Sequence, residues 1–161
     1  MTTGPQRLRL VDGSPAEDFA QAADRLAVAF ARSAEYQDRS GEFPYANMAL
    51  LHDAGLLALT APLELGGQGV GLAGAAEVIR RVAKGEPSTA LILSMQYINM
   101  HSLPRGRWAR QLAQQVVTDA VTKGGLINAL RVEPELGTPH RGGLPATTAR
   151  RTADGWCLSG R

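Results

Sequence analysis

Three runs between residues 128 and 161 decide the fold of this chain: NALRVEPELGT (128–138), PATTARR (145–151) and DGWCLSGR (154–161). Residues 146–152 and 156–158 have strand-like composition and flank Asp154-Gly155, a dipeptide that favours a tight hairpin turn. The short apolar run 126–131 has no helical spacing and predicts a buried strand. The sequence therefore predicts β-structure from about Gly125 onward.

Upstream of Gly125, apolar residues recur at helical spacing. Ser14-Pro15-Ala16-Glu17 predicts a helix start, because Ser14 can cap the amide of Glu17 and Pro15 needs no donor there. We expect that helix to end before Gly41. A second helix is expected from Pro44, with Gly55 as its left-handed C-cap.

Further helices are predicted over 72–84, 88–103 and within 107–123. The helix 88–103 has apolar residues on nearly all sides, which is typical of a central buried helix. Helices followed by strands indicate two domains rather than βαβ units. We therefore predict a mainly α fold with three parts: a disordered tail over 1–13, a helical domain over 14–124 and a partial β-domain over 125–161.

The predicted hairpin ends at Arg161. A hairpin alone is marginally stable in water and leaves unpaired strand edges. We therefore expect the β-domain to be truncated, with further strands following in the parent protein.

Composition indicates a soluble globular protein: 44% of the 161 residues are hydrophobic and 20% are charged. No apolar run approaches the roughly 18 residues of a membrane span, and no signal peptide is recognisable, so we expect a cytoplasmic protein. Cys157 is the only cysteine, which excludes an intrachain disulfide and argues against a metal site. No catalytic triad or zinc motif is present.

Charge is unevenly distributed along the chain. Residues 105–161 contain 9 basic and 4 acidic side chains, whereas residues 1–104 contain 8 and 11. A basic C-terminal part suits a phosphorylated ligand such as a flavin dinucleotide or coenzyme A, and a solvated Arg-rich surface is an equally good interpretation. Basic runs interleaved with aromatic residues are absent, so we expect no nucleic-acid partner.

Residues 69–74 match the dinucleotide fingerprint G-x-G-x-x-G. The fingerprint needs its first glycine directly after a strand, but residues 62–68 separate Gly69 from the candidate strand 56–61. It also needs an acidic residue after a second strand, and the candidate 89–95 ends at Met95-Gln96. We therefore interpret residues 69–74 as a loop that caps and spaces helices.

Four features in order resemble the acyl-CoA dehydrogenase superfamily: Phe43-Pro44, Ala54-Gly55-Leu56, the loop Pro62-x-Glu64-x-Gly66-Gly67-x-Gly69, and Glu133 to Thr138. The resemblance covers about residues 16–161. It implies a helical N-terminal domain followed by the first strands of a middle β-barrel domain.

In that family the Glu-Pro-x-x-Gly-Ser segment lines the flavin and meets the acyl thioester. The resemblance therefore implies that FAD is bound by Ala129, Leu130, Arg131, Val132, Glu133, Pro134, Gly137 and Thr138, and that Thr138 also contacts substrate. A turn of this composition presents free N–H groups that suit flavin or pyrophosphate oxygens. Without the resemblance, the segment reads as a surface turn between strands.

The implied reaction is α,β-dehydrogenation of an acyl-CoA thioester, with electrons passing to an electron-transfer flavoprotein. The base in the family is a Glu of a C-terminal helical domain, so no residue of this chain is assigned a catalytic role. We expect the full-length protein to form homo-oligomers, and the fragment alone to be inactive. We expect His101 to be a core residue, and Gln96 and Asn99 to serve packing or capping rather than to face a thioester or the flavin edge.

Several departures leave other functions open. Val132 stands where dehydrogenases have Thr, Thr138 replaces Ser, and Pro139 replaces Asp. Asn128-Ala129 resembles the reduced-flavin monooxygenase branch of the superfamily, so oxygenation of a sulfur or aromatic compound is the first alternative. A non-catalytic helical fragment that acts only by association is the second.

Overall fold

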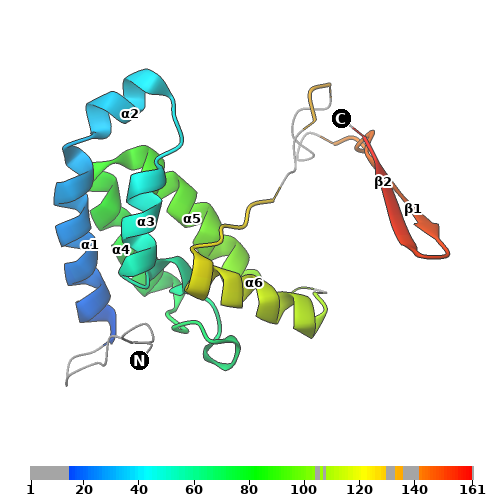
Figure 1. Ribbon diagram of the computed structural model, residues 1–161, viewed down its shortest axis with the longest axis horizontal. Helices are drawn as coiled ribbons and strands as arrows, with labels where there is room; N and C mark the ends of the chain where they lie inside the picture. The colour runs from blue at the N-terminus through cyan, green and yellow to red at the C-terminus, as the bar shows by residue number, and fades with distance from the viewer. Residues whose placement is uncertain (1–14, 104–105, 107, 130–132, 136–141, 161) are drawn as a thin grey trace, which may run out of the picture. The chain divides into compact units, whose positions relative to one another are not determined.

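The computed structural model describes residues 15–103, 106, 108–129, 133–135 and 142–160. The chain divides into two compact units, Met1–Asn128 and Ala129–Arg161. Helices make up the first unit, and a two-stranded hairpin makes up the regular part of the second (Figure 1). The mainly α fold predicted from the sequence is confirmed.

The first unit contains six α-helices and two short 3₁₀ turns among its described residues. In chain order they are α1 (Pro15–Ala31), α2 (Ala34–Ser40), α3 (Tyr45–Asp53), η1 (Leu56–Ala58), η2 (Leu63–Leu65), α4 (Leu72–Gly85), α5 (Pro87–Ser102) and α6 (Arg110–Lys123). Among these described helices, none combines the length and the apolar character that crossing a bilayer requires.

The predicted helix before Gly41 is two helices, because the backbone ladder is interrupted at residues 32–33. There the amides of Arg32 and Ser33 bond three residues back, to Ala29 and Phe30, instead of four. The Ser33 hydroxyl also donates to the Phe30 carbonyl at 3.2 Å. Gly41 ends α2 in the left-handed conformation, with φ of 64°. The predicted cap at Ser14 lies outside the described residues.

The main core lies where α1 packs against α4 and α4 packs against α5 (Figure 1). Helix α3 and the turn η1 also contribute to this core. Its large, fully buried side chains include Phe30, Leu51, Leu56, Leu57, Leu93 and Tyr97. Helices α1 and α4 approach closely at Gly85, where an added Cβ would lie 2.1 Å from the Ala27 carbonyl oxygen. A second apolar cluster joins the η1–η2 loop, the end of α5 and α6 around Met100 and Val117.

Helix α5 is buried on one side only, so the prediction that it is buried all round was wrong. Leu93 and Met100 belong to the two cores, whereas Leu91 is 65% exposed and Ile98 is 57% exposed. Leu91 and Ile98 are seven residues apart and so share one helix face. The sequence pattern could not reveal this, because an apolar residue on an uncovered face looks the same as one in a core.

The predicted hairpin is confirmed as the antiparallel pair β1 (Thr148–Thr152) and β2 (Gly155–Ser159). Its turn residues are Ala153 and Asp154, since Thr152 pairs with Gly155. The predicted turn dipeptide is therefore shifted by one residue, and Gly155 opens β2 with φ of 136°.

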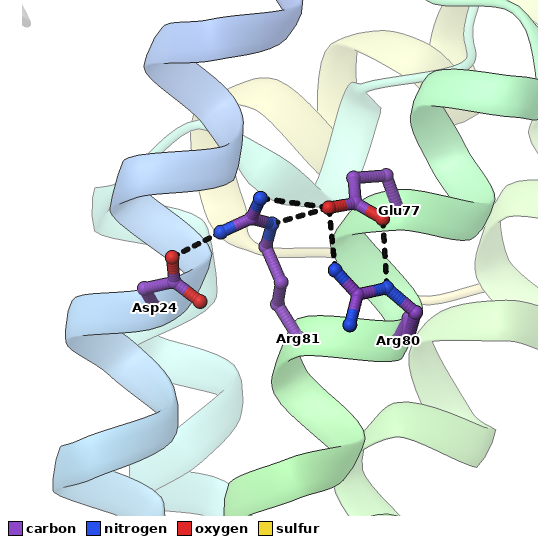
Figure 2. A network of polar contacts seen from close by, with 4 residues as sticks. All are labelled: Asp24, Glu77, Arg80 and Arg81. Carbon is purple, nitrogen blue, oxygen red and sulfur yellow. Dashed lines mark hydrogen bonds and ion pairs between the residues drawn. The ribbon is translucent and has the colours of Figure 1, made fainter.

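Figure 2 shows a charged network that ties α1 to α4 at the surface. Arg81 bonds both Asp24 of α1 and Glu77 of its own helix, and Arg80 also bonds Glu77 with N···O distances of 2.7 and 2.8 Å. Hydrogen bonding from Arg80, opposed by desolvation and reinforced by Arg81, lowers the pKa of Glu77 to about 2.

We expect the replacement Glu77→Gln to lower the melting temperature slightly at pH 7, because an exposed ion pair contributes little. The depressed pKa means that the contribution of Glu77 is complete above its ordinary pKa of 4.5 and is lost as the pH falls toward about 2. Thermal melts should therefore show a smaller difference in melting temperature between wild type and Glu77→Gln at pH 3 than at pH 7. A gap that widens on acidification would contradict this. Glu64→Gln, at an exposed position on η2, is the control.

Candidate functional site

The chain leaves the helical unit through residues 124–129, and Gln96 of α5 holds this segment by its backbone. The Gln96 Nε2 donates to the carbonyls of Leu57 and Gly125, each at 3.2 Å, and its Oε1 accepts from the Ile127 amide at 2.8 Å. The Gln96 residue is only 1% exposed. Its side chain therefore joins α5, η1 and the exit segment in one buried cluster of hydrogen bonds.

The predicted strand over 126–131 is absent from its described part, because residues 126–129 form no ladder. Leu126 is exposed, and the amide of Ile127 bonds the side chain of Gln96 instead of a neighbouring strand. A strand needs hydrogen-bond partners for its backbone groups on a neighbouring strand. Here the Gln96 side chain accepts the hydrogen bond of the Ile127 amide instead.

Gln96 and Asn99 both bond backbone groups. The Asn99 Nδ2 donates to the Met95 carbonyl within α5 at 2.8 Å. The role of Gln96 is larger than predicted, since its partners lie 29 to 39 residues away along the chain.

A second polar anchor lies at Glu133, in the unit Ala129–Arg161. The Glu133 Oε2 accepts from the Ala146 amide at 2.7 Å, and its Oε1 accepts from the Thr147 amide at 2.9 Å. Hydrogen bonding from the side chain and backbone of Thr147, and from the backbone of Ala146, lowers the pKa of Glu133. The carboxylate is thus held in its charged form next to the start of β1. Pro134 and Glu135 follow it in a turn.

The structure describes three of the predicted cofactor-binding residues: Ala129, Glu133 and Pro134. The other five lie outside the described residues: Leu130, Arg131, Val132, Gly137 and Thr138. Thr138 was also the predicted substrate contact.

The described part of this region offers two guanidinium groups to a phosphorylated, anionic cofactor. Arg150 and Arg151 lie on β1, and Asp154 is the only acidic residue within 142–160. Guanidinium groups and backbone amides are the usual partners of phosphate oxygens. The described part also carries Glu133 and Glu135, so the two arginines suit phosphate oxygens in hydrogen-bonding chemistry, whereas the three carboxylates leave no net positive charge.

A buried polar cluster at the start of α5 was missed by the sequence analysis. Glu86 is 3% exposed and caps the helix by accepting from the amides of Ser88 at 2.9 Å and Thr89 at 2.6 Å. The Thr89 hydroxyl donates to Glu86 and accepts from the Asn47 side chain of α3 at 2.9 Å. Burial, the largest influence, raises the pKa of Glu86, but these hydrogen bonds outweigh it and lower the pKa. An acidic residue directly before Pro87 is the signal that could have identified this cap.

Among the described residues, the two remaining histidine candidates lie in different pockets. A pocket of about 330 Å³ lies beside α6, and among the described residues that line it His52 alone is titratable. The His52 Nε2 lies 3.0 Å from the Val121 carbonyl oxygen. His101 lines a different pocket of about 300 Å³ together with Glu64. His140 lies outside the described residues. Within the part of the chain that the structure describes, no group of three His, Cys, Asp or Glu side chains could hold a metal ion.

The G-x-G-x-x-G run over 69–74 also carries no nucleotide site of the βαβ type. The candidate strand before it, 56–61, contains the 3₁₀ turn η1, and the candidate second strand, 89–95, is part of α5. A Rossmann site requires both strands. Residues 69–71 form the loop that precedes α4, whereas residues 72–74 are the first turn of that helix, so the interpretation as a loop is confirmed for 69–71 only.

The chain is similar to proteins of a known family in sequence and in fold. Residues 15–106 match the model of the family described as Acyl-CoA dehydrogenase, N-terminal domain. The chain belongs to this family. The match spans α1 through α5 and covers more than half of the 161 residues.

Individual relatives of this acyl-CoA dehydrogenase N-terminal domain agree with the family match. A Bacillus subtilis (strain 168) protein named "Putative acyl-CoA dehydrogenase YdbM" is 32% identical over 137 residues, which is 85% of this chain and 36% of that protein. The solved structure of KijD3 in complex with dTDP has a TM-score of 0.75 and 29% identity, over 91% of this chain and 38% of that one.

A more distant neighbour of the acyl-CoA dehydrogenase domain shares the fold alone. The structure of methanesulfinate monooxygenase MsuC from Pseudomonas fluorescens has a TM-score of 0.69 at 24% identity, over 92% of this chain and 35% of that one. The chain thus spans about a third of the length of these relatives.

Proposed function

We propose that this chain is the N-terminal part of an FAD-dependent acyl-CoA dehydrogenase that forms the α,β double bond of acyl-CoA thioesters. The observation that carries the proposal is the family match over residues 15–106, supported by the 32% identity to a Bacillus subtilis protein named for that activity. Bound FAD would supply the acceptor for the hydride that leaves the β-carbon.

This chain's own contribution is to bind and position. The proposed flavin contacts are Ala129, Leu130, Arg131, Val132, Glu133, Pro134, Gly137 and Thr138, with Thr138 also offering its hydroxyl to the substrate. Backbone amides and Arg side chains would hold the flavin, because they suit its carbonyl and phosphate oxygens. Proton removal from the α-carbon requires a base, and we assign none within these 161 residues.

Further features of the parent protein belong to the same proposal. We propose a homo-oligomer that works in the cytoplasm and passes electrons to an electron-transfer flavoprotein. The exposed apolar positions Leu91 and Ile98 on α5 leave surface for further packing, which supports a larger assembly.

The test is anaerobic titration of the purified protein, as its gene encodes it, with butanoyl-, octanoyl- and palmitoyl-CoA. We expect at least one thioester to bleach the visible flavin band and to yield the corresponding enoyl-CoA in equal amount. Bound flavin that none of the three thioesters bleaches would contradict the dehydrogenase. Purification without any flavin, and no uptake of added FAD, would contradict the flavoprotein itself.

A reduced-flavin monooxygenase acting on a sulfur or aromatic compound is the second candidate. Asn128 and Val132 favour it, because Val132 lacks the hydroxyl that Thr supplies at this position in dehydrogenases. The fold is compatible with either function, since the methanesulfinate monooxygenase shares it. Oxygen uptake coupled to an oxygenated product, without dehydrogenation of any acyl-CoA, would favour this function.

A non-catalytic helical fragment that acts only by association is the third candidate. Size-exclusion chromatography and thermal melting of the 161-residue chain separate it from the others. A cooperative, monomeric chain would favour an independent module, whereas aggregation would indicate a part that needs the rest of its parent.

A further inference from the structure

Three exposed aromatic side chains, Tyr36, Phe43 and Tyr45, lie around the connection between α2 and α3, at one end of the helical unit (Figure 1). The Tyr36 hydroxyl donates to the Glu42 Oε2 at 2.9 Å. The rings of Phe43 and Tyr45 meet edge to face, with their centroids 4.8 Å apart. We call these three aromatic residues the aromatic rim. Exposed aromatic side chains that gather in one place are typical of surfaces that bind a partner.

A cavity of about 280 Å³ lies beside the aromatic rim, between the α2–α3 connection and the start of α5. Glu42 and Phe43 line it from the connection, and Glu86 and Ile92 line it from the side of α5. The two tyrosines of the rim contact these lining residues and so lie at the edge of the cavity. Pockets for drug-sized ligands usually measure roughly 300–1,000 Å³, so this cavity has room for little more than one long side chain.

The cavity has two negative groups and no positive one. Its described lining residues include the carboxylates of Glu42 and Glu86 but no Lys, Arg or His. Neither carboxylate forms an ion pair among the described residues, because Glu42 accepts from a tyrosine hydroxyl and Glu86 accepts from amides and a hydroxyl at the start of α5. The basic residue nearest to Glu42 in the sequence, Arg39, is paired with Glu35 instead. The charge of the cavity would therefore be complemented by a cation from outside the helical unit.

The two carboxylates act on a ligand in different ways. Glu42 is exposed and can contact a ligand directly, whereas Glu86 is buried and acts through its electric field. Burial opposes the ionisation of Glu86, but its amide and hydroxyl bonds outweigh burial and lower its pKa, so its negative charge persists at neutral pH. Solvent screens this charge only weakly, because the carboxylate lies inside the protein.

An arginine side chain matches these features better than other cations do. Its planar guanidinium can donate two parallel hydrogen bonds to the Glu42 carboxylate and can stack on the ring of Phe43. Its aliphatic stem can pack on Ile92. A metal ion is a poorer match, because the described residues offer no group of three His, Cys, Asp or Glu ligands.

We propose that the aromatic rim and its cavity form a docking site for an arginine-bearing segment of another protein. The guanidinium enters the cavity and pairs with Glu42 in the field of Glu86, while the residues that flank the arginine pack on Tyr36 and Tyr45. This inference does not depend on the proposed function, because none of these residues is a proposed flavin or substrate contact.

Saturation-transfer NMR tests the proposal, because it detects weak ligands of large proteins. The protein, as its gene encodes it, is titrated with three probes: the peptide Ac-Ala-Ala-Arg-Ala-Ala-NH₂, the same peptide with citrulline in place of arginine, and n-propylguanidinium. Citrulline has nearly the shape of arginine and no charge, so we expect its peptide to bind roughly tenfold more weakly than the arginine peptide, or worse. We expect n-propylguanidinium to bind roughly threefold more weakly or worse, because it has no flanking residues to pack on the rim.

Three variants locate the site. Glu42→Gln removes the accessible carboxylate at an exposed position, and we expect it to weaken binding of the arginine peptide roughly fivefold or more. Phe43→Leu keeps an apolar side chain but removes the ring, and it should weaken binding roughly twofold to fivefold. Asp38→Asn is the matched control, because it removes one negative charge from an exposed position of α2 outside the cavity and should leave the affinity unchanged. Thermal melts check that each variant is folded.

Binding that requires arginine, Glu42 and Phe43 but not Asp38 supports the inference. Equal binding of the arginine and citrulline peptides, or equal weakening by Glu42→Gln and Asp38→Asn, overturns it, because the contact is then uncharged or a general effect of net charge. Equal affinity for n-propylguanidinium and the arginine peptide indicates a small-molecule site and overturns the protein partner. Absence of binding to wild type also overturns it, whether another segment of the parent protein, a second copy or solvent fills the cavity. All these outcomes leave the proposed function untouched.

Discussion

Replacing Gly85 with alanine is expected to destabilise the helical unit by about 3 kcal/mol, the upper part of the usual range for overpacking. The Cβ would lie 2.1 Å from the Ala27 carbonyl oxygen and 2.7 Å from the Ala27 Cα. These are backbone atoms, so no side-chain rotation relieves the clash, and α1 and α4 must move apart. Inside a helix, alanine is normally more favourable than glycine by up to about 1 kcal/mol. A net loss of stability in Gly85→Ala would therefore come from the close contact with Ala27.

Thermal melting by circular dichroism measures this effect. We expect the melting temperature of Gly85→Ala to fall by roughly 10 °C, given a few degrees per kcal/mol for a unit of this size. Gly71→Ala is the matched control, because an added Cβ there meets nothing within 4 Å and its φ of −73° suits any residue. Equal melting temperatures for Gly85→Ala and Gly71→Ala would show that the two helices tolerate a wider separation.

The second large effect is expected for Gln96→Glu, and it should depend on pH. The introduced carboxyl would keep the Oε1 that accepts from Ile127, but its other oxygen would face the carbonyl oxygens of Leu57 and Gly125. A buried charge in such a place costs roughly 3 kcal/mol or more. Below its pKa the carboxyl is neutral and can donate one hydrogen bond to one of these two carbonyls. Most of the lost stability is then recovered.

The direction of the pH dependence follows from the difference in the pKa of the introduced carboxyl between the folded and unfolded states. Burial and the facing carbonyls raise the pKa of the introduced carboxyl in the folded state above its ordinary value. The variant therefore approaches wild type at pH 4 to 5 and loses stability as the pH rises above that ordinary value. Urea unfolding at pH 5 and pH 8 tests this, with Gln115→Glu on the exposed side of α6 as the control. A stability difference that is equal at both pH values would mean that the carboxyl finds a different partner.

Local patterns account for what the sequence predicted correctly. The helix ends at Gly41 and Gly55 and the hairpin near Asp154 follow from glycine conformations and turn chemistry, which act over a few residues. The interruption at residues 32–33 was missed because no glycine or proline marks it, and the apolar spacing, which ends at Phe30, gave no sign of a second helix over 34–40. A serine whose hydroxyl turns back to its own helix leaves no trace in the spacing.

The site was less predictable, because its decisive contacts are long-range and involve the backbone. Gln96 reaches partners up to 39 residues away, and Glu133 reaches amides 13 and 14 residues away. Backbone amides are present at every non-proline residue, so residue types alone cannot show which of them a side chain selects. Resemblance to the family identified the segment around Glu133, and the structure supplied the partners of its carboxylate.

The buried cap of α5 and the surface network of Figure 2 hold their carboxylates by different means. Asp24 and Glu77 are paired with guanidinium groups in contact with solvent, so dissolved ions screen their attraction. Glu86 is held by amide and hydroxyl dipoles in the protein interior, where ions do not reach. Guanidinium chloride is an electrolyte and urea is not. We therefore expect urea to report a slightly higher stability for this helical unit than guanidinium chloride, because guanidinium chloride screens the ion pairs between α1 and α4 and leaves the Glu86 cap intact.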